Sequence, residues 1–187
     1  MKFVIISLLA QLALSAPVYK KAVFAGGCFW CMEPPFDKQP GVIATISGYS
    51  GGESSNATYQ DVSSGLTKHI EAIEVTYDPK KVTYKKLLDI FWRQVNPTDS
   101  KGQFVDRGHH YTTAIFTTNE KEKTTAEQSK KEVQKYFKRK VITPIIPLKK
   151  FYPAEAYHQD YYKKNPIRYK FYRFNSGRDQ YLNKIWN

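Results

Sequence analysis

Cys28 and Cys31 are the only cysteines of the 187-residue chain, and two residues separate them. They follow Gly26 and Gly27, which end an apolar run that we expect to be a strand. If a helix begins here, its free N–H groups and its dipole favour a thiolate at Cys28. Positions i and i+3 share a helix face, so Cys31 can reach an oxidised Cys28 after a small rearrangement. The spacing predicts thiol redox chemistry with an attacking and a resolving cysteine.

Three other interpretations of the pair stay open at this point. A zinc site needs four ligands, but no second CxxC exists, and the rings of the adjacent His109 and His110 tend to point apart. A structural disulfide across so small a loop stabilises little. A thioredoxin-like oxidoreductase also begins a helix with CxxC after a strand. Here, however, Phe29 and Trp30 lie between the cysteines, and two large aromatic rings beside a thiol suit a pocket for an apolar group.

The elements that must position this pair are strands and helices in mixed order. Glycine, proline and hydrophobic periodicity predict strands at 21–27, 42–49, 70–77, 111–117 and 141–147. Helices are expected from Cys28, shortened by Pro34 and Pro35, from Thr83 as a cap, and at 119–137 and 154–163. An irregular, aromatic and basic tail is expected to follow. This order predicts an α+β two-layer sandwich with a ferredoxin-like core and a mixed or antiparallel sheet.

Length and composition suit one globular domain, which we place at residues 17–187. The chain is 41% hydrophobic and 15% aromatic, and its body has no run of about 18 apolar residues that could span a membrane. Residues 1–16 begin with a basic Lys2, continue as an apolar run and end in small residues, which is typical of a signal peptide. We therefore expect export to the periplasm or the exterior. An N-terminal strand or an uncleaved anchor is the alternative, and the protein is cytoplasmic if the segment is not a signal.

The net charge of +12 is spread over residues 80–86, 121–140 and 168–178. Lysine-rich helix faces of this kind are usually solvated, although they can also attract an acidic partner or a membrane surface. Aromatic and basic residues alternate in the tail, as in some nucleic-acid-binding surfaces. We expect no specific nucleic-acid binding. The aromatic tail is expected to pack on the domain or to line the rim of the active site.

Further motifs follow the cysteine pair in a fixed order: Gly27-Cys28-Phe29-Trp30, GYSGG at 48–52, Thr58-Tyr59, HIEA at 69–72, DRGHHY at 106–111 and YHQDY at 157–161. Together they resemble the peptide methionine sulfoxide reductase A family over roughly Val23 to Tyr161. The resemblance implies an enzyme that reduces the S-epimer of methionine sulfoxide, free or in oxidised proteins and peptides. It also implies a monomer without metal or bound cofactor that uses thioredoxin or another dithiol as reductant.

The resemblance also implies the roles of the site residues. These are Cys28 as nucleophile, Glu71 as the acid that protonates the sulfoxide oxygen, Tyr59 and Tyr111 as hydroxyls that hold this oxygen, Phe29 and Trp30 as the pocket for the substrate methyl group, and Asp106 as a polar support. The residues alone select few of these. Glu74 is as well placed as Glu71 in the sequence, and the chain has 14 tyrosines.

One departure from the family pattern concerns the resolving thiol. Many members have glycine at the position of Cys31 and carry their resolving cysteine near the C-terminus, but this chain has no cysteine after Cys31. The resolving role therefore falls to Cys31 or to an external thiol, and we expect Cys31. The competing functions are a general thiol–disulfide oxidoreductase and a basic binding module.

Overall fold

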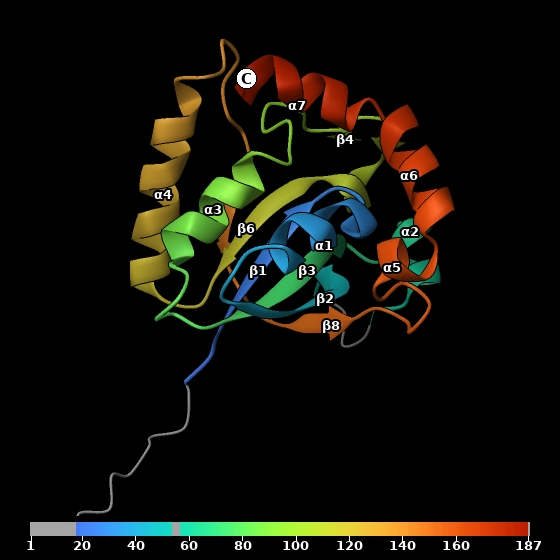
Figure 1. Ribbon diagram of the computed structural model, residues 1–187, viewed down its shortest axis with the longest axis horizontal. Helices are drawn as coiled ribbons and strands as arrows, with labels where there is room; N and C mark the ends of the chain where they lie inside the picture. Colours follow the sequence, from blue (N-terminus) through green and yellow to red (C-terminus); the bar gives the residue numbers. More distant parts are fainter. Residues whose placement is uncertain (1–17, 54–56, 187) are drawn as a thin grey trace, which may run out of the picture.

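Six strands form one mixed sheet in the computed structural model, which describes residues 18–53 and 57–186 (Figure 1). The strand order is β7-β6-β1-β3-β2-β8, and every neighbouring pair is antiparallel except β6 and β7. Their bounds are Lys20–Gly26 for β1, Val42–Ser50 for β2, Ile70–Tyr77 for β3, Thr113–Thr117 for β6, Ile145–Pro147 for β7 and Phe151–Pro153 for β8. The expected signal peptide at 1–16 lies outside the described residues.

The centre of the fold is a βαββαβ unit, as in ferredoxin-like folds. Its helices are α1 at Phe29–Asp37 and α3 at Tyr84–Trp92, and its strands lie in the order β6-β1-β3-β2. In Figure 1 both helices lie in front of the sheet, and α4 at Glu120–Gln134 lies beside α3. The expected α+β sandwich with a ferredoxin-like core and mixed sheet is therefore confirmed. A short hairpin of β4, Gly102–Gln103, and β5, Asp106–Arg107, lies outside this sheet.

Alternation along the strands creates the core between the sheet and the helices. Phe24 of β1 points to the helix side, where its ring stacks on Phe36 of α1 at 5.4 Å and on Phe91 of α3 at 5.5 Å. Each such buried ring contributes about 1.5–3 kcal/mol through burial alone. Its neighbours Val23 and Ala25 belong to a smaller apolar cluster on the opposite face. The packing of β1 and α1 on a common core fixes the turn between them, where Cys28 lies.

Most boundaries follow the expected pattern. The expected strand at 70–77 has the observed bounds of β3, and the strand at 42–49 extends by one residue in β2. Thr83 caps α3, because its hydroxyl accepts a hydrogen bond from the Lys86 N–H at 3.2 Å. Pro34 and Pro35 lie inside α1, which ends after nine residues. Local propensity therefore predicted these elements correctly.

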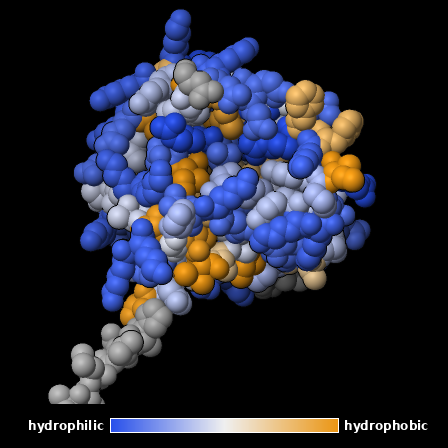
Figure 2. Space-filling view, viewed as in Figure 1, coloured by the Kyte–Doolittle hydropathy of each residue, from blue (hydrophilic) through white to orange (hydrophobic). Residues whose placement is uncertain are grey.

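The prediction of an irregular C-terminal tail is wrong, because residues 161–186 are largely helical. α5 comprises Tyr161–Lys164, α6 Pro166–Asn175 and α7 Arg178–Trp186, and the helix expected at 154–163 reduces to α5. The half-buried side of α6 carries Tyr169, Tyr172 and Arg173 at helical spacing, whereas its large apolar residues Ile167 and Phe171 are exposed. Figure 2 shows apolar side chains at the right-hand edge, where α6 lies. A search for an apolar inner face therefore misses this helix.

Candidate active site

Cys28 is the N-cap residue of α1, directly after the glycine pair that ends β1. Gly27 has φ +79°, a conformation that favours glycine, and a Cβ there would lie 2.6 Å from the Cβ of Gln103. The chain can therefore turn sharply between β1 and α1. This turn places the Cys28 side chain, which is 5% exposed, at the base of a small pocket.

The pocket brings together seven of the eight site residues expected from the sequence. It is lined by Cys28, Phe29, Trp30, Tyr59, Glu71, Asp106, Tyr111, His158 and Tyr172. Its volume is about 80 Å³, far below the roughly 300–1,000 Å³ of most cofactor or drug-sized sites. The pocket therefore suits the end of one side chain. The eighth residue, Cys31, is fully buried behind it.

Glu71 lies on β3 with its carboxyl group beneath the start of α1. Its Oε2 accepts a hydrogen bond from the Phe29 N–H at 3.0 Å, and the residue is 2% exposed. Burial raises the pKa of this carboxyl well above its ordinary value, and the hydrogen bond from Phe29 opposes the shift only in part. Glu71 is therefore a neutral acid that faces the pocket. Glu74 lies on the other face of the strand and pairs with Lys21 at 2.7 Å.

Two tyrosine hydroxyls enter the pocket from separate segments. Tyr59 begins α2, Tyr59–Ser63, and its backbone N–H donates to the Glu155 Oε1 at 2.8 Å. The other oxygen of Glu155 accepts from the Tyr49 hydroxyl at 2.9 Å, which fixes the position of this carboxylate. Tyr111 ends the short 3-10 helix η1, His109–Tyr111. Burial raises the pKa of both Tyr59 and Tyr111, so both remain protonated hydrogen-bond donors.

Aromatic rings form the apolar part of the pocket. Phe29 is buried, and its ring lies 4.8 Å from that of His158. Trp30 stacks on Tyr161 at 3.7 Å and donates its Nε1–H to the His158 Nδ1 at 3.2 Å. This contact requires the neutral tautomer of His158 with its proton on Nε2. Burial lowers the pKa of His158, which also favours the neutral ring. These contacts hold Phe29 and Trp30 in fixed orientations at the pocket wall.

Asp106 reaches the pocket from the β4–β5 hairpin and meets the C-terminal helix α6. The Tyr172 hydroxyl donates to the Asp106 Oδ2 at 2.5 Å. Burial raises the pKa of Asp106, while this hydrogen bond and the positive charge of Arg178 oppose the shift. The hydrogen bond closes one side of the pocket, so the aromatic tail does line the rim of the site.

The two thiols have opposite protonation tendencies. Burial first, then its hydrogen bond and charge interaction with Cys31 and the charge of Asp106, raise the pKa of Cys28 well above its ordinary value. The hydrogen bond with Cys28 lowers the pKa of Cys31 to about 6; burial opposes this effect, and Arg178 and Arg173 lower it further. The expectation of a Cys28 thiolate is therefore wrong for the free protein. Burial and nearby acids outweigh the helix N-terminus, and the negative charge of the pair lies on Cys31.

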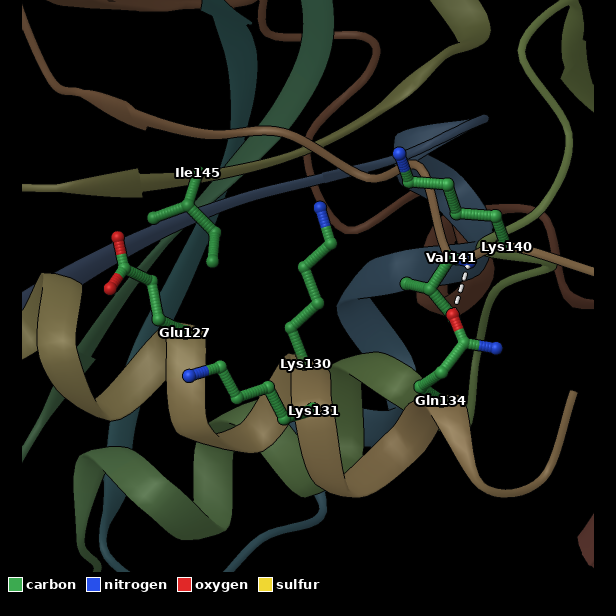
Figure 3. Close-up of a pocket in the computed structure, with 7 residues that line it drawn as sticks. All are labelled: Glu127, Lys130, Lys131, Gln134, Lys140, Val141 and Ile145. Atoms are coloured by element: carbon green, nitrogen blue, oxygen red, sulfur yellow. Dashed lines mark hydrogen bonds between the residues drawn. The ribbon is translucent and has the colours of Figure 1, made fainter.

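Other parts of the described chain offer less chemistry. Within residues 18–53 and 57–186, no group of three or more His, Cys, Asp or Glu side chains is placed to hold a metal ion. Nor does any described helix have the length and apolar character needed to cross a bilayer. A larger hollow of about 560 Å³ beside α4 is shown in Figure 3. It is lined by Glu127, Lys130, Lys131, Gln134, Lys140, Val141 and Ile145, a set without thiols.

Sequence reasoning assigned no role to several residues that shape the site. His158 lies within the YHQDY motif, so the motif itself was a signal, but its contact with Trp30 is visible only in the fold. Glu155 lies near that motif and positions Tyr59. Tyr172, Arg173 and Arg178 come from the segment expected to be irregular, and only the pattern of α6 and α7 places them near the cysteines.

Comparison with known proteins agrees with this geometry. The sequence profile described as "Peptide methionine sulfoxide reductase" matches residues 20–187. Peptide methionine sulfoxide reductase MsrA from Bacillus licheniformis is 52% identical over 167 residues, which cover 88% of this chain and 92% of the relative. An MsrA/MsrB protein from Vibrio cholerae is 54% identical over 170 residues. The match covers 90% of this chain but 45% of that relative, so this chain spans less than half of it.

Solved structures show the same fold. Mxr1 from Saccharomyces cerevisiae in reduced form has a TM-score of 0.76 and 34% identity, covering 86% of this chain and 93% of that chain. Mxr1 in complex with Trx2 has a TM-score of 0.55 and 25% identity, covering 83% of this chain and 94% of that chain. Profile, relatives and fold extend over nearly all described residues and include the pocket around Cys28. The chain therefore belongs to the peptide methionine sulfoxide reductase family.

Proposed function

We propose that the protein reduces methionine S-sulfoxide, free or in polypeptides, to methionine with Cys28 as nucleophile. The observation that carries this proposal is the meeting of three groups in a pocket of about 80 Å³: the Cys28 thiol, the neutral acid Glu71 and the rings of Phe29 and Trp30. The rings form an apolar surface on which the methyl group of the substrate can pack. The acid can protonate the sulfoxide oxygen, and the thiol can attack the sulfoxide sulfur.

In the first step the Cys28 sulfur bonds to the sulfoxide sulfur. Glu71 protonates the oxygen, which makes it a better leaving group, while Tyr59 and Tyr111 donate hydrogen bonds to it. The Cys31 thiolate accepts the proton that Cys28 loses. The oxygen then passes to Cys28 as a sulfenic acid and methionine leaves. Methionine sulfur is reduced by two electrons and Cys28 is oxidised by two, so no bound cofactor is needed.

In the second step Cys31 closes a disulfide with Cys28. The Cys31 thiol, which now carries the proton from Cys28, attacks the Cys28 sulfur and the S–O bond breaks. The departing hydroxide takes this proton and leaves as water, and solvent reprotonates Glu71. The N–H of Cys31 bonds to the carbonyl of Cys28 at 3.0 Å, so the two residues share one helical turn. A dithiol of the thioredoxin type then supplies two electrons and two protons. The complex of yeast Mxr1 with Trx2 supports a reductant of this kind for the present chain.

A general thiol–disulfide oxidoreductase is the alternative, and one assay separates the two. With dithiothreitol as reductant, the protein should reduce the S-epimer of a methionine sulfoxide peptide and leave the R-epimer intact. Cys28→Ser should abolish the reaction. Reduction of insulin disulfides without any sulfoxide reduction would contradict the proposal and identify the alternative.

The compartment and the domain boundaries are further proposals. The basic Lys2 and the apolar segment that follows it support export through a signal peptide at residues 1–16, with residues 17–187 as a single catalytic domain. Cell fractionation and N-terminal sequencing of the mature protein test this proposal. Full-length protein in the cytoplasm would contradict it. The monomeric state stays a prediction, which size-exclusion chromatography can test.

A further inference from the structure

A row of large apolar side chains on α6 faces solvent. Ile167, Phe171 and Phe174 are 84%, 73% and 69% exposed. They follow one another at intervals of four and three residues, so they share one face of the helix. Figure 2 shows apolar side chains at this edge of the molecule. Single exposed apolar residues are ordinary on a protein surface, but a contiguous patch of them is typical of an interaction site.

A groove begins at this row and is the second feature of α6. Its volume is about 460 Å³, and it is lined by Trp30, Tyr161, Ile167, Arg168, Phe171 and Tyr172. Five of these six residues are aromatic or aliphatic, and the sixth is a cation. Phe174 belongs to the same row but does not line the hollow. We call this hollow the α6 groove.

The α6 groove adjoins the catalytic pocket. Trp30 and Tyr172 line both hollows. Their rings lie 6.2 Å apart and nearly perpendicular to each other, so little more than the width of these rings separates the two spaces. An extended chain rises about 3.3 Å per residue, so a side chain roughly two or three residues from an occupied pocket lies about 7–10 Å away. Such a side chain can reach the groove.

Hydrogen bonds hold α6 in a fixed position beside the catalytic turn. Arg173 of α6 donates from its Nη1 to the Cys31 carbonyl at 3.1 Å. Arg178, at the start of α7, donates from its Nη1 to the Gly26 carbonyl at 3.2 Å. Both bonds add to the one that the Tyr172 hydroxyl makes at the pocket rim. The groove therefore keeps a constant distance from the catalytic pocket.

The small size of the catalytic pocket leaves most of a polypeptide substrate outside it. A volume of about 80 Å³ holds the end of one side chain, and Cys28 at its base is only 5% exposed. The backbone and the neighbouring side chains must therefore lie on the surface around the pocket. The two larger hollows beside α4 share no lining residue with the pocket, whereas the α6 groove shares two. A bound polypeptide is therefore the partner that the groove is placed to meet.

The lining of the groove favours an aromatic side chain. The rings of Trp30 and Phe171 offer surfaces on which another ring can pack in an offset or edge-on arrangement. The guanidinium of Arg168 can stack on the same ring. No carboxylate lies within α6, whose other exposed charge is Lys170. A lysine side chain of the substrate would thus meet charges of its own sign.

We propose that the α6 groove binds an aromatic side chain that lies roughly two or three residues from the methionine sulfoxide of a polypeptide substrate. This inference rests on the proposed function and adds a subsite that free methionine sulfoxide does not reach. Aromatic side chains are mostly buried in folded proteins. The protein should therefore act best on oxidised segments that are unfolded or flexible.

Peptide kinetics with dithiothreitol as reductant test the subsite. One peptide carries a single methionine S-sulfoxide among glycine and serine, and matched peptides place phenylalanine or lysine roughly two or three residues away on either side. The best phenylalanine peptide should exceed the glycine and serine peptide about tenfold in kcat/KM, or about 1.4 kcal/mol. The gain should appear in KM, because a contact far from the sulfur is equally strong in ground and transition states. The lysine peptides should show no gain.

Substitutions on α6 locate the effect. Phe171→Ser should lower the preference for the phenylalanine peptide to within about twofold of unity, and Phe171→Tyr should keep it. Phe174→Ser is the matched control, because Phe174 is similarly exposed on the same helix face but lies outside the groove. It should retain the wild-type preference. Free methionine S-sulfoxide, measured with every variant, normalises each rate to the state of the catalytic pocket.

A binding measurement separates this proposal from the proposed function. Calorimetric titration of a Cys28→Ser protein with the same peptides gives their affinities without turnover. If the phenylalanine peptide binds more tightly but the wild-type protein reduces no sulfoxide, the groove stands and the proposed function fails. If the wild-type protein reduces all peptides equally well, the proposed function stands and the groove proposal is overturned.

Two further outcomes would assign the groove to another occupant and also overturn the proposal. In the first, Phe171→Ser raises the KM for thioredoxin and leaves the peptide preference intact, which makes the groove a docking site for the reductant. In the second, the wild-type protein is a dimer in size-exclusion chromatography and Phe171→Ser is a monomer with unchanged peptide preference. The groove is then an interface between two copies of the chain.

Discussion

Replacing Glu71 with glutamine isolates the proton that the proposed mechanism requires. The Glu71 Oε2 accepts the Phe29 N–H at 3.0 Å, and the amide oxygen of glutamine can accept the same bond. Size and burial stay the same. The substitution therefore removes the acidic proton while the first turn of α1 keeps its hydrogen bond.

The expected magnitudes follow from burial. A positioned general acid contributes about 10²- to 10⁴-fold to a rate, so sulfoxide reduction should fall within this range. The free energy of unfolding at neutral pH should instead increase. The pKa of Glu71 is raised in the folded protein, so the folded state binds more protons than the unfolded chain and stability falls as pH rises above the ordinary carboxyl value. Each pH unit between the ordinary and the raised pKa lowers the free energy of unfolding by about 1.4 kcal/mol. Glutamine does not titrate and therefore removes this loss.

The assay combines rate and stability on one pair of variants. Methionine release from an S-sulfoxide peptide gives the rate, and urea unfolding at about pH 4 and about pH 7 gives the free energy of unfolding. Glu74→Gln is the matched control on the same strand, because Glu74 pairs with Lys21 outside the pocket. It should keep the wild-type rate. Glu71→Gln should gain stability at the higher pH only.

Two results would refute this reasoning. Full activity in Glu71→Gln would show that the sulfoxide oxygen obtains its proton elsewhere. A loss of stability near neutral pH would show that Glu71 is ionised in the folded protein and serves as a structural anion.

Two further predictions concern the turn and the resolving thiol. Cys31→Ser should reduce one equivalent of sulfoxide and then stall with thioredoxin, while dithiothreitol still supports turnover; sustained turnover with thioredoxin would exclude Cys31 as resolver. Gly27→Ala should lower the free energy of unfolding by more than Gly65→Ala, because both glycines have φ +79° but only Gly27 lacks space for a Cβ. The positive φ costs both variants about 1–3 kcal/mol. Only Gly27→Ala also places its Cβ in a crowded position, so equal losses in urea unfolding would mean that the turn relaxes around the new methyl group.

The sequence predicted the central fold well because local and tertiary preferences agree there. β-branched residues and turn signals bounded β2 and β3, and Thr83 marked the start of α3. The C-terminal helices escaped prediction because the half-buried side of α6 carries tyrosines and an arginine, whereas Ile167 and Phe171 are exposed. Apolar periodicity has no signal for a helix of this kind.

The sequence by itself predicted the two cysteines of the site but not its acid. Spacing alone identified Cys28 and Cys31, but Glu71 depended on resemblance, because Glu74 is equivalent until strand register separates their faces. Protonation was the least predictable property. The helix N-terminus favours a thiolate at Cys28, yet burial raises the pKa of Cys28, while the hydrogen bond with Cys28 and then Arg178 and Arg173 lower the pKa of Cys31.

The hydrogen bond between Arg178 and Gly26 joins residues 152 positions apart. Closing so long a loop costs conformational entropy, so contacts of this separation form late in folding. A nascent chain that has emerged only as far as α6 already carries both cysteines but lacks the contact of Arg178 with the turn before them. A stop codon before position 178 would likewise leave the β1–α1 turn without this hydrogen bond. Part of what holds the turn in place is thus acquired only when α7 has been synthesised and docked.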